Sequence, residues 1–244
     1  MRRLIRACTF VLLLASCALA YAEGYWLGRF RLALIDDPVR VEFQSGAPVP
    51  TRDALQQAIT SAAASQDWKV ANPADGRMEL TRTVRNEHTM LIEVTYSSSG
   101  YLIRYLQSTN LMYSDKGAKG ENVRVIHGNY NEWINDLVLA VNRGLGTQTQ
   151  TTIGFARTDN VDAVPFLKAG GRSGYKEFLA TGTPRAFAIA PNGSWGRDTQ
   201  KTNNTRWDVV ENALERCNRR GEGQCRLYAI DNHVVWTVPE KKTP

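Results

Sequence analysis

The feature that most constrains the fold is the alternation of apolar and polar residues between positions 77 and 108. Its central segment, 89–97, places four apolar side chains on one side: Met90, Ile92, Val94 and Tyr96. A period of two indicates a strand with one buried face. Serine and glycine residues, which favour turns, separate this segment from the next. We therefore predict an antiparallel meander of three strands at 77–84, 89–97 and 101–108.

Two helical patterns flank this meander, and a short strand at 68–70 with a turn at 72–76 leads into it. Thr51 can cap the first helix, whose apolar stripe is Leu55, Ala58, Ile59 and Ala62. In the second, Asn129 and Glu132 have the spacing of a capping box, and the stripe is Trp133, Leu137, Ala140 and Val141. Gly144 is expected to end it. Residues 23–145 should thus form an α+β domain of helix, antiparallel meander and closing helix.

The chain beyond position 145 indicates a second unit. The polar sequence GTQTQTT at 146–152 breaks the periodicity, so we place a boundary there and assign 146–184 to a linker and packing segment. Residues 185–244 then predict a small β-α-β-β unit. Its helix follows Thr205, which can cap it, and carries Trp207, Val210, Leu214 and Cys217 along one face.

The N-terminus has the pattern of an export signal. A basic start, MRRLIR, precedes an uncharged apolar run at 7–22 that is shorter than a permanent membrane span. Ordinary cleavage after Ala20 or Ala22 fits this run. So does a lipobox, made by Leu14, Ala15, Ser16 and Cys17. Because a cysteine at that one position is unusual in a plain signal, we expect cleavage before Cys17 and lipidation of its side chain.

Charge gives little support to a nucleic-acid partner. The whole chain carries +6, but removing the signal removes three arginines and no acid, which leaves about +3. The remaining basic residues are dispersed along the sequence rather than gathered in a stripe. We therefore predict no nucleic-acid partner.

The two cysteines of the mature protein are expected to pair. Cys217 and Cys225 lie close together, and an exported protein meets an oxidising compartment. A zinc site is the alternative, but His88, His127 and His233 show no ligand spacing with the cysteines. We therefore expect a disulfide, and neither a metal nor a cofactor.

No residue pattern predicts a catalytic centre. His127 beside Asn129 and Glu132 could work as an acid–base group, although helix capping explains the same spacing. The sequences GRSGY at 171–175 and NGSWG at 192–196 only approach the motif of a serine hydrolase. We name no catalytic residue.

The strand at 101–106 is apolar on both of its faces. Leu102 and Leu106 flank Arg104 on the side away from Tyr101, Ile103 and Tyr105. Each apolar face should be covered. The segment after Gly146 or the second unit could cover it, and a partner-binding surface formed by Leu102, Arg104 and Leu106 is the alternative.

Two stretches resemble known sequences. Residues 51–145 are similar to an uncharacterised family of small bacterial envelope lipoproteins, on the basis of Ile103, Arg104, Tyr105, Ser108, Asn110, Leu111, Tyr113, Ile126, His127, Tyr130, Asn131 and Trp133. The sequences PRAFAIAPNGSWG and ALERCNRRGEGQCRLYAIDNHVVW resemble a small disulfide-bearing module of exported bacterial proteins. These resemblances imply location and fold, and neither family brings an activity with it.

Together these features predict an exported bacterial protein, tethered by lipid to the periplasmic face of a membrane, the outer rather than the inner. We expect a non-catalytic binding or assembly component whose partner is an envelope protein or glycan. A cell-envelope enzyme, such as a hydrolase of wall or polysaccharide, is one alternative. A periplasmic sensor of a small ligand is the other.

Overall fold

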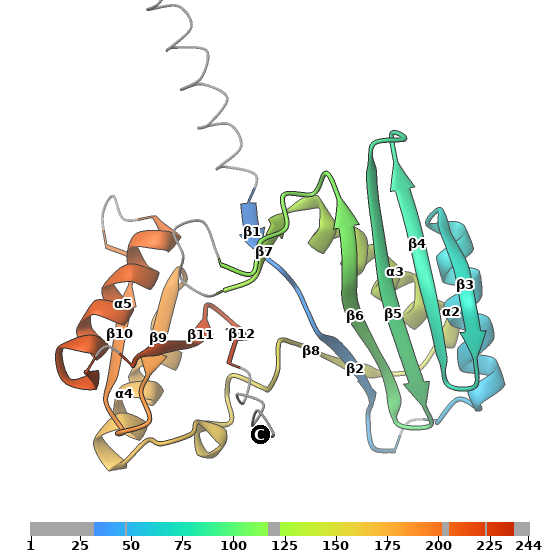
Figure 1. Cartoon of the computed structure of the whole chain (residues 1–244). Coiled ribbons are helices and arrows are strands. Elements are labelled where there is room, and N and C mark those ends of the chain that lie inside the picture. Colours follow the sequence, from blue (N-terminus) through green and yellow to red (C-terminus); the bar gives the residue numbers. More distant parts are fainter. Residues whose placement is uncertain (1–31, 47, 117–122, 202–204, 223, 237–244) are drawn as a thin grey trace, which may run out of the picture.

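The computed structural model describes residues 32–46, 48–116, 123–201, 205–222 and 224–236, and its fold is mixed α+β (Figure 1). Figure 1 shows two units side by side, each built around an antiparallel sheet. Cys17 and the predicted signal, and so the lipobox prediction, lie outside the described residues.

The first unit contains a six-stranded antiparallel sheet with the order β3-β4-β5-β6-β2-β8. Its strands are β2 (Val39–Phe43), β3 (Trp68–Ala74), β4 (Arg77–Val84), β5 (His88–Ser97), β6 (Gly100–Thr109) and β8 (Thr149–Ile153). The predicted meander is present as β4, β5 and β6, with the expected inner residues of β5 buried. The predicted turn at 72–76 is wrong in extent, because β3 continues through a bulge to Ala74 and only 75–76 turn.

Helices α2 (Arg52–Ser65) and α3 (Asn129–Leu145) contact each other and supply core residues to one face of this sheet. The Thr51 hydroxyl accepts a hydrogen bond from the Ala54 amide, as the sequence predicts. The capping box at Asn129 is wrong: Asn129 is already helical and the cap residue is Gly128. Gly146, in the left-handed conformation, ends α3 instead of Gly144.

The segment predicted as a linker and packing segment contributes to both units. β8 pairs with β2 from Thr149 opposite Phe43 to Ile153 opposite Val39. A polar strand at a sheet edge has no apolar alternation, which explains why the sequence pattern there suggests a boundary. Further along, helix α4 (Ala169–Leu179) packs on the second sheet.

The second unit has a four-stranded antiparallel sheet with the order β10-β9-β11-β12. Its elements are β9 (Arg185–Ile189), β10 (Trp195–Thr199), α5 (Arg206–Gly221), β11 (Arg226–Ile230) and β12 (His233–Val234). The predicted β-α-β-β order therefore lacks β10, which lies in the stretch expected to be a polar loop. Only its two alternate residues Gly196 and Asp198 are buried, so it has no buried apolar stripe.

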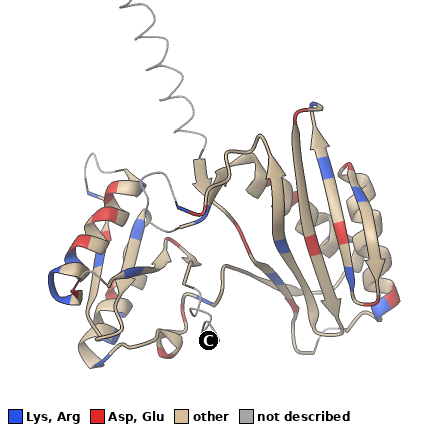
Figure 2. Ribbon diagram, viewed as in Figure 1, with Lys and Arg blue, Asp and Glu red and all other residues tan. Residues whose placement is uncertain are grey.

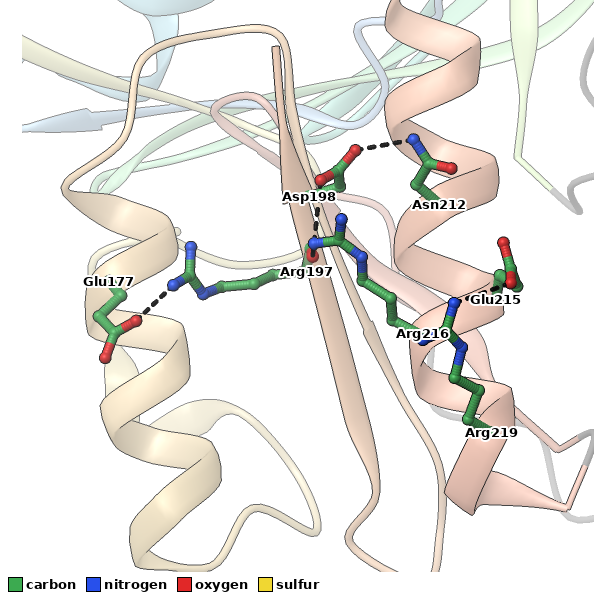
Figure 3. A network of polar contacts seen from close by, with 7 residues as sticks. All are labelled: Glu177, Arg197, Asp198, Asn212, Glu215, Arg216 and Arg219. Carbon is green, nitrogen blue, oxygen red and sulfur yellow. Dashed lines mark hydrogen bonds and ion pairs between the residues drawn. The ribbon is translucent and has the colours of Figure 1, made fainter. Parts of the chain in front are cut away.

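Helices α4 and α5 lie on opposite faces of this sheet (Figure 3). Trp195 packs against Gly171 and Gly174 of α4, while the next residue, Gly196, lies against the backbone of α5. On the α5 side, the buried Asp198 carboxylate accepts a hydrogen bond from Asn212 at 2.9 Å and forms an ion pair with Arg216 at 3.0 Å (Figure 3). On the α4 side, Arg197 forms an ion pair with Glu177. The polar network thus fixes both helices to the same edge strand.

The Cys217–Cys225 disulfide is confirmed. The two Cα atoms are 6.0 Å apart, and the bond ties α5 to the residue before β11. Cys217 is fully buried against the sheet.

A two-stranded ribbon joins the two units. β1 (Leu32–Leu34) pairs with β7 (Val125–His127), and apolar residues of the ribbon belong to the same core cluster as α5 and β9. A parallel bridge between Gly154 and Val234 also links the end of β8 to β12. Within the described ranges, no helix is long and apolar enough to cross a bilayer.

Candidate functional site

The predicted partner surface lies on the face of the six-stranded sheet opposite the buried residues of its core. Leu102 is half-buried beside Arg40 and Thr95 of the neighbouring strands, and Arg104 is exposed opposite Glu93. Leu106, at a register shift between β5 and β6, is 41% exposed. The three predicted residues therefore share one strand and one open surface.

The second unit does not close over this surface. Its contacts with the first unit run through the β1–β7 ribbon, the bridge at Gly154 and an ion pair at Asp36. The intramolecular cover that the sequence suggested, by the segment after Gly146 or by the second unit, is therefore incomplete, because Arg104 and Leu106 remain exposed. The face is otherwise polar: Arg77 forms ion pairs with Glu79 and Glu93, and Figure 2 shows acidic and basic positions on β4 and β5.

A second candidate site lies where the two units meet, and sequence reasoning missed it. His233 of β12 approaches Asp36 with its Nε2 atom 3.3 Å from Oδ1. The Asp36 amide donates to the side-chain oxygen of Asn131 at 2.9 Å, and the Asn131 amide group donates to the Leu34 carbonyl at 2.6 Å. Asn131 thus holds the chain before Asp36 in place.

Burial shapes the electrostatics of this junction. It raises the pKa of the Asp36 carboxyl above its ordinary value, while the nearby His233 and Arg206 oppose the shift. Arg206 itself pairs with Asp231 at 2.9 Å. The Nδ1 atom of His233 is covered and has no hydrogen-bond partner among the described residues.

The neighbouring carboxylate, Asp37, is fully engaged. Its oxygens accept hydrogen bonds from the Tyr105 amide, at 2.5 Å, and from the Arg124 guanidinium. Arg124 also donates to the Asp37 carbonyl at 2.6 Å and stacks over the ring of Phe155 at 5.2 Å. These contacts connect the chain before β2 to β6, to the ribbon and to the segment after β8.

A cavity of about 140 Å³ opens beside these groups and is lined by Asp37, Arg124, Phe155 and His233 together with apolar residues. None of its lining residues carries a hydroxyl or thiol group, so a serine- or cysteine-type nucleophile is absent from this cavity. The only acid–base groups available are Asp37, already bonded to Arg124 and Tyr105, and His233, whose second nitrogen is covered. The geometry favours a structural junction over a reaction centre.

His127 at the start of α3, for which the sequence allowed an acid–base role or a capping role, makes a capping contact. The Nδ1 atom of His127 accepts a hydrogen bond from the Asn129 amide at 3.2 Å, so the ring satisfies a free amide of the first helical turn. Within the part of the chain that the structure describes, no three His, Cys, Asp or Glu side chains are grouped as metal ligands.

Comparisons with protein-family models, with curated proteins and with solved structures find no match to this chain.

Proposed function

We propose that this chain is an exported bacterial envelope protein, lipidated at Cys17, that binds an envelope partner without catalysing a reaction. The lipobox sequence and the resemblance to envelope lipoproteins support the tether and the periplasmic face of the outer membrane. The observation that carries the binding role is the open face of the six-stranded sheet, on which Leu106 remains 41% exposed. The partner is an envelope protein or glycan.

The chemistry of this face favours recognition. Leu102, Arg104 and Leu106 place apolar and cationic groups on one rigid strand, next to the carboxylate of Glu93. A sheet holds its side chains at fixed spacing, so such a surface loses little conformational entropy when a partner binds. Its charges of both signs suit a partner that is itself polar at the rim of the contact.

Site-specific photocrosslinking in living cells tests the proposal. A photoreactive amino acid in place of Leu106 should give one defined adduct, and Arg104→Glu in the same chain should reduce its yield. The control position is Lys176 of α4, exposed on the second unit, where no adduct should form. Equal labelling at both positions, or no labelling at Leu106, would contradict a binding role for this face.

A cell-envelope enzyme is the second candidate, because Asp37 and His233 both line the junction cavity. A hydrolase acting there would lose its activity on wall or polysaccharide when His233 is changed to Ala. Retained binding at Leu106 with no measurable hydrolysis by the unaltered protein would favour the binding role.

A further inference from the structure

A groove with a volume of about 680 Å³ lies between α2 and α3. Its floor is made of small residues: Ala54, Ala58 and Ala62 from α2, and Ala140 and Gly144 from α3. The two helices come close there, since a Cβ atom on Gly144 would lie 3.8 Å from that of Ala58. The volume falls within the range of about 300–1,000 Å³ that small-molecule sites occupy.

The described lining of the groove contains one charged side chain, whose position at the C-terminal end of α3 complements the helix dipole. Arg143, in the last turn of α3, is the only charged residue among the described lining residues. It is exposed and forms no ion pair with any residue that the structure describes. A ligand that complements the groove therefore carries a negative group for Arg143.

The rest of the lining favours a hydrocarbon chain over an extended peptide. Along α2 and the body of α3 the backbone groups are bonded within the helices, so a peptide backbone would find partners only at the last carbonyls of α3 and in side chains such as Ser61 and Gln57. An alkyl chain needs no such partners. Val49, held between Pro48 and Pro50 at the rim, is 58% exposed and offers it a further apolar contact.

We propose that this groove binds a fatty-acid-like amphiphile, with its acyl chain on the alanine floor and its carboxylate at Arg143. The groove lies on the helical side of the six-stranded sheet, away from the proposed binding face. The two proposals can therefore fail independently.

Titration of the mature protein with laurate, below the micelle concentration, tests this proposal by calorimetry and by NMR shifts of α2 and α3. Laurate should bind saturably, one per chain. Arg143→Gln should weaken binding about five- to tenfold, because a charged hydrogen bond is lost. Ser61→Trp, at an exposed position of α2, should block the groove. Arg40→Gln, on the opposite face, is the matched control and should change nothing.

The charge of the head group provides a second check. Dodecylamine and methyl laurate carry the same chain without a carboxylate. They should bind more weakly than laurate to the unaltered protein, whereas the Arg143→Gln variant should bind all three ligands with similar affinity. Equal binding of all three ligands, or an unchanged affinity in Arg143→Gln, would overturn the proposal. Absence of saturable laurate binding, with a protein adduct at a photocrosslinker in place of Ser61, would assign the groove to a protein and overturn it too.

Discussion

Replacing Gly196 by Ala tests the packing of the second unit. A Cβ atom there would lie 2.3 Å from the Ala213 carbonyl oxygen and 2.4 Å from the Cys217 amide nitrogen. Both atoms belong to the backbone of α5, so no side chain can rotate away, and the helix must shift from β10. Overpacking of a core costs about 1–3 kcal/mol, and we expect the upper end, about 3 kcal/mol.

For a chain of this size, that loss corresponds to a fall of about 6–12 °C in Tm. Urea denaturation followed by far-UV circular dichroism gives the free energy of unfolding directly. The matched control is Gly170→Ala in α4, where an added Cβ meets nothing within 4 Å. It should stabilise the protein by up to about 1 kcal/mol, because alanine favours a helix. A change below about 0.5 kcal/mol for Gly196→Ala would refute the close approach of α5 to β10.

Three further predictions concern stability. Removing the disulfide by replacing Cys217 and Cys225 together with Ala should lower the free energy of unfolding by about 2.5 kcal/mol in urea melts, from the entropy of the loop it closes. The raised pKa of Asp36 makes the folded protein bind a proton more readily than the unfolded chain. The free energy of unfolding should therefore fall as the pH rises from the ordinary aspartate pKa of 3.8 through the raised pKa of Asp36. Asp36→Asn should flatten that slope in melts run from about pH 4 to about pH 7. Arg82 lies 5.4 Å from the ring of Trp133 with two buried nitrogens unpartnered. Arg82→Ala should cost about 1–2 kcal/mol in thermal melts because packing and the cation–π contact are lost, and Arg82→Met, which keeps the packing and removes the unpartnered nitrogens, should cost less.

Periodicity predicted the elements that bury one face. The apolar stripe after Thr51 corresponds to α2, and the apolar–polar alternation around Ile92 corresponds to β5. Burial of a single face makes apolar residues recur with the period of a helix or a strand. The two closely spaced cysteines in a chain expected to be exported were likewise sufficient to predict the disulfide.

Elements stabilised by distant partners were not predicted. β8 consists of threonine and glutamine with one isoleucine, and it is a strand because β2 offers it free backbone groups. β10 buries a glycine and a charged aspartate, which no apolar pattern reveals. The pairing of Asp36 with His233 joins residues from opposite ends of the described chain. Such contacts depend on the tertiary arrangement and leave no periodic signal.

We propose that Cys17 anchors the protein to a membrane, and mass spectrometry of the mature N-terminal peptide tests this proposal most directly. We predict an N-terminus at Cys17 that bears a diacylglycerol group, with the protein in the detergent phase. Cys17→Ala should block maturation or release the protein into the soluble fraction. An unmodified N-terminus at Tyr21 or Glu23 in the unaltered protein would contradict the tether.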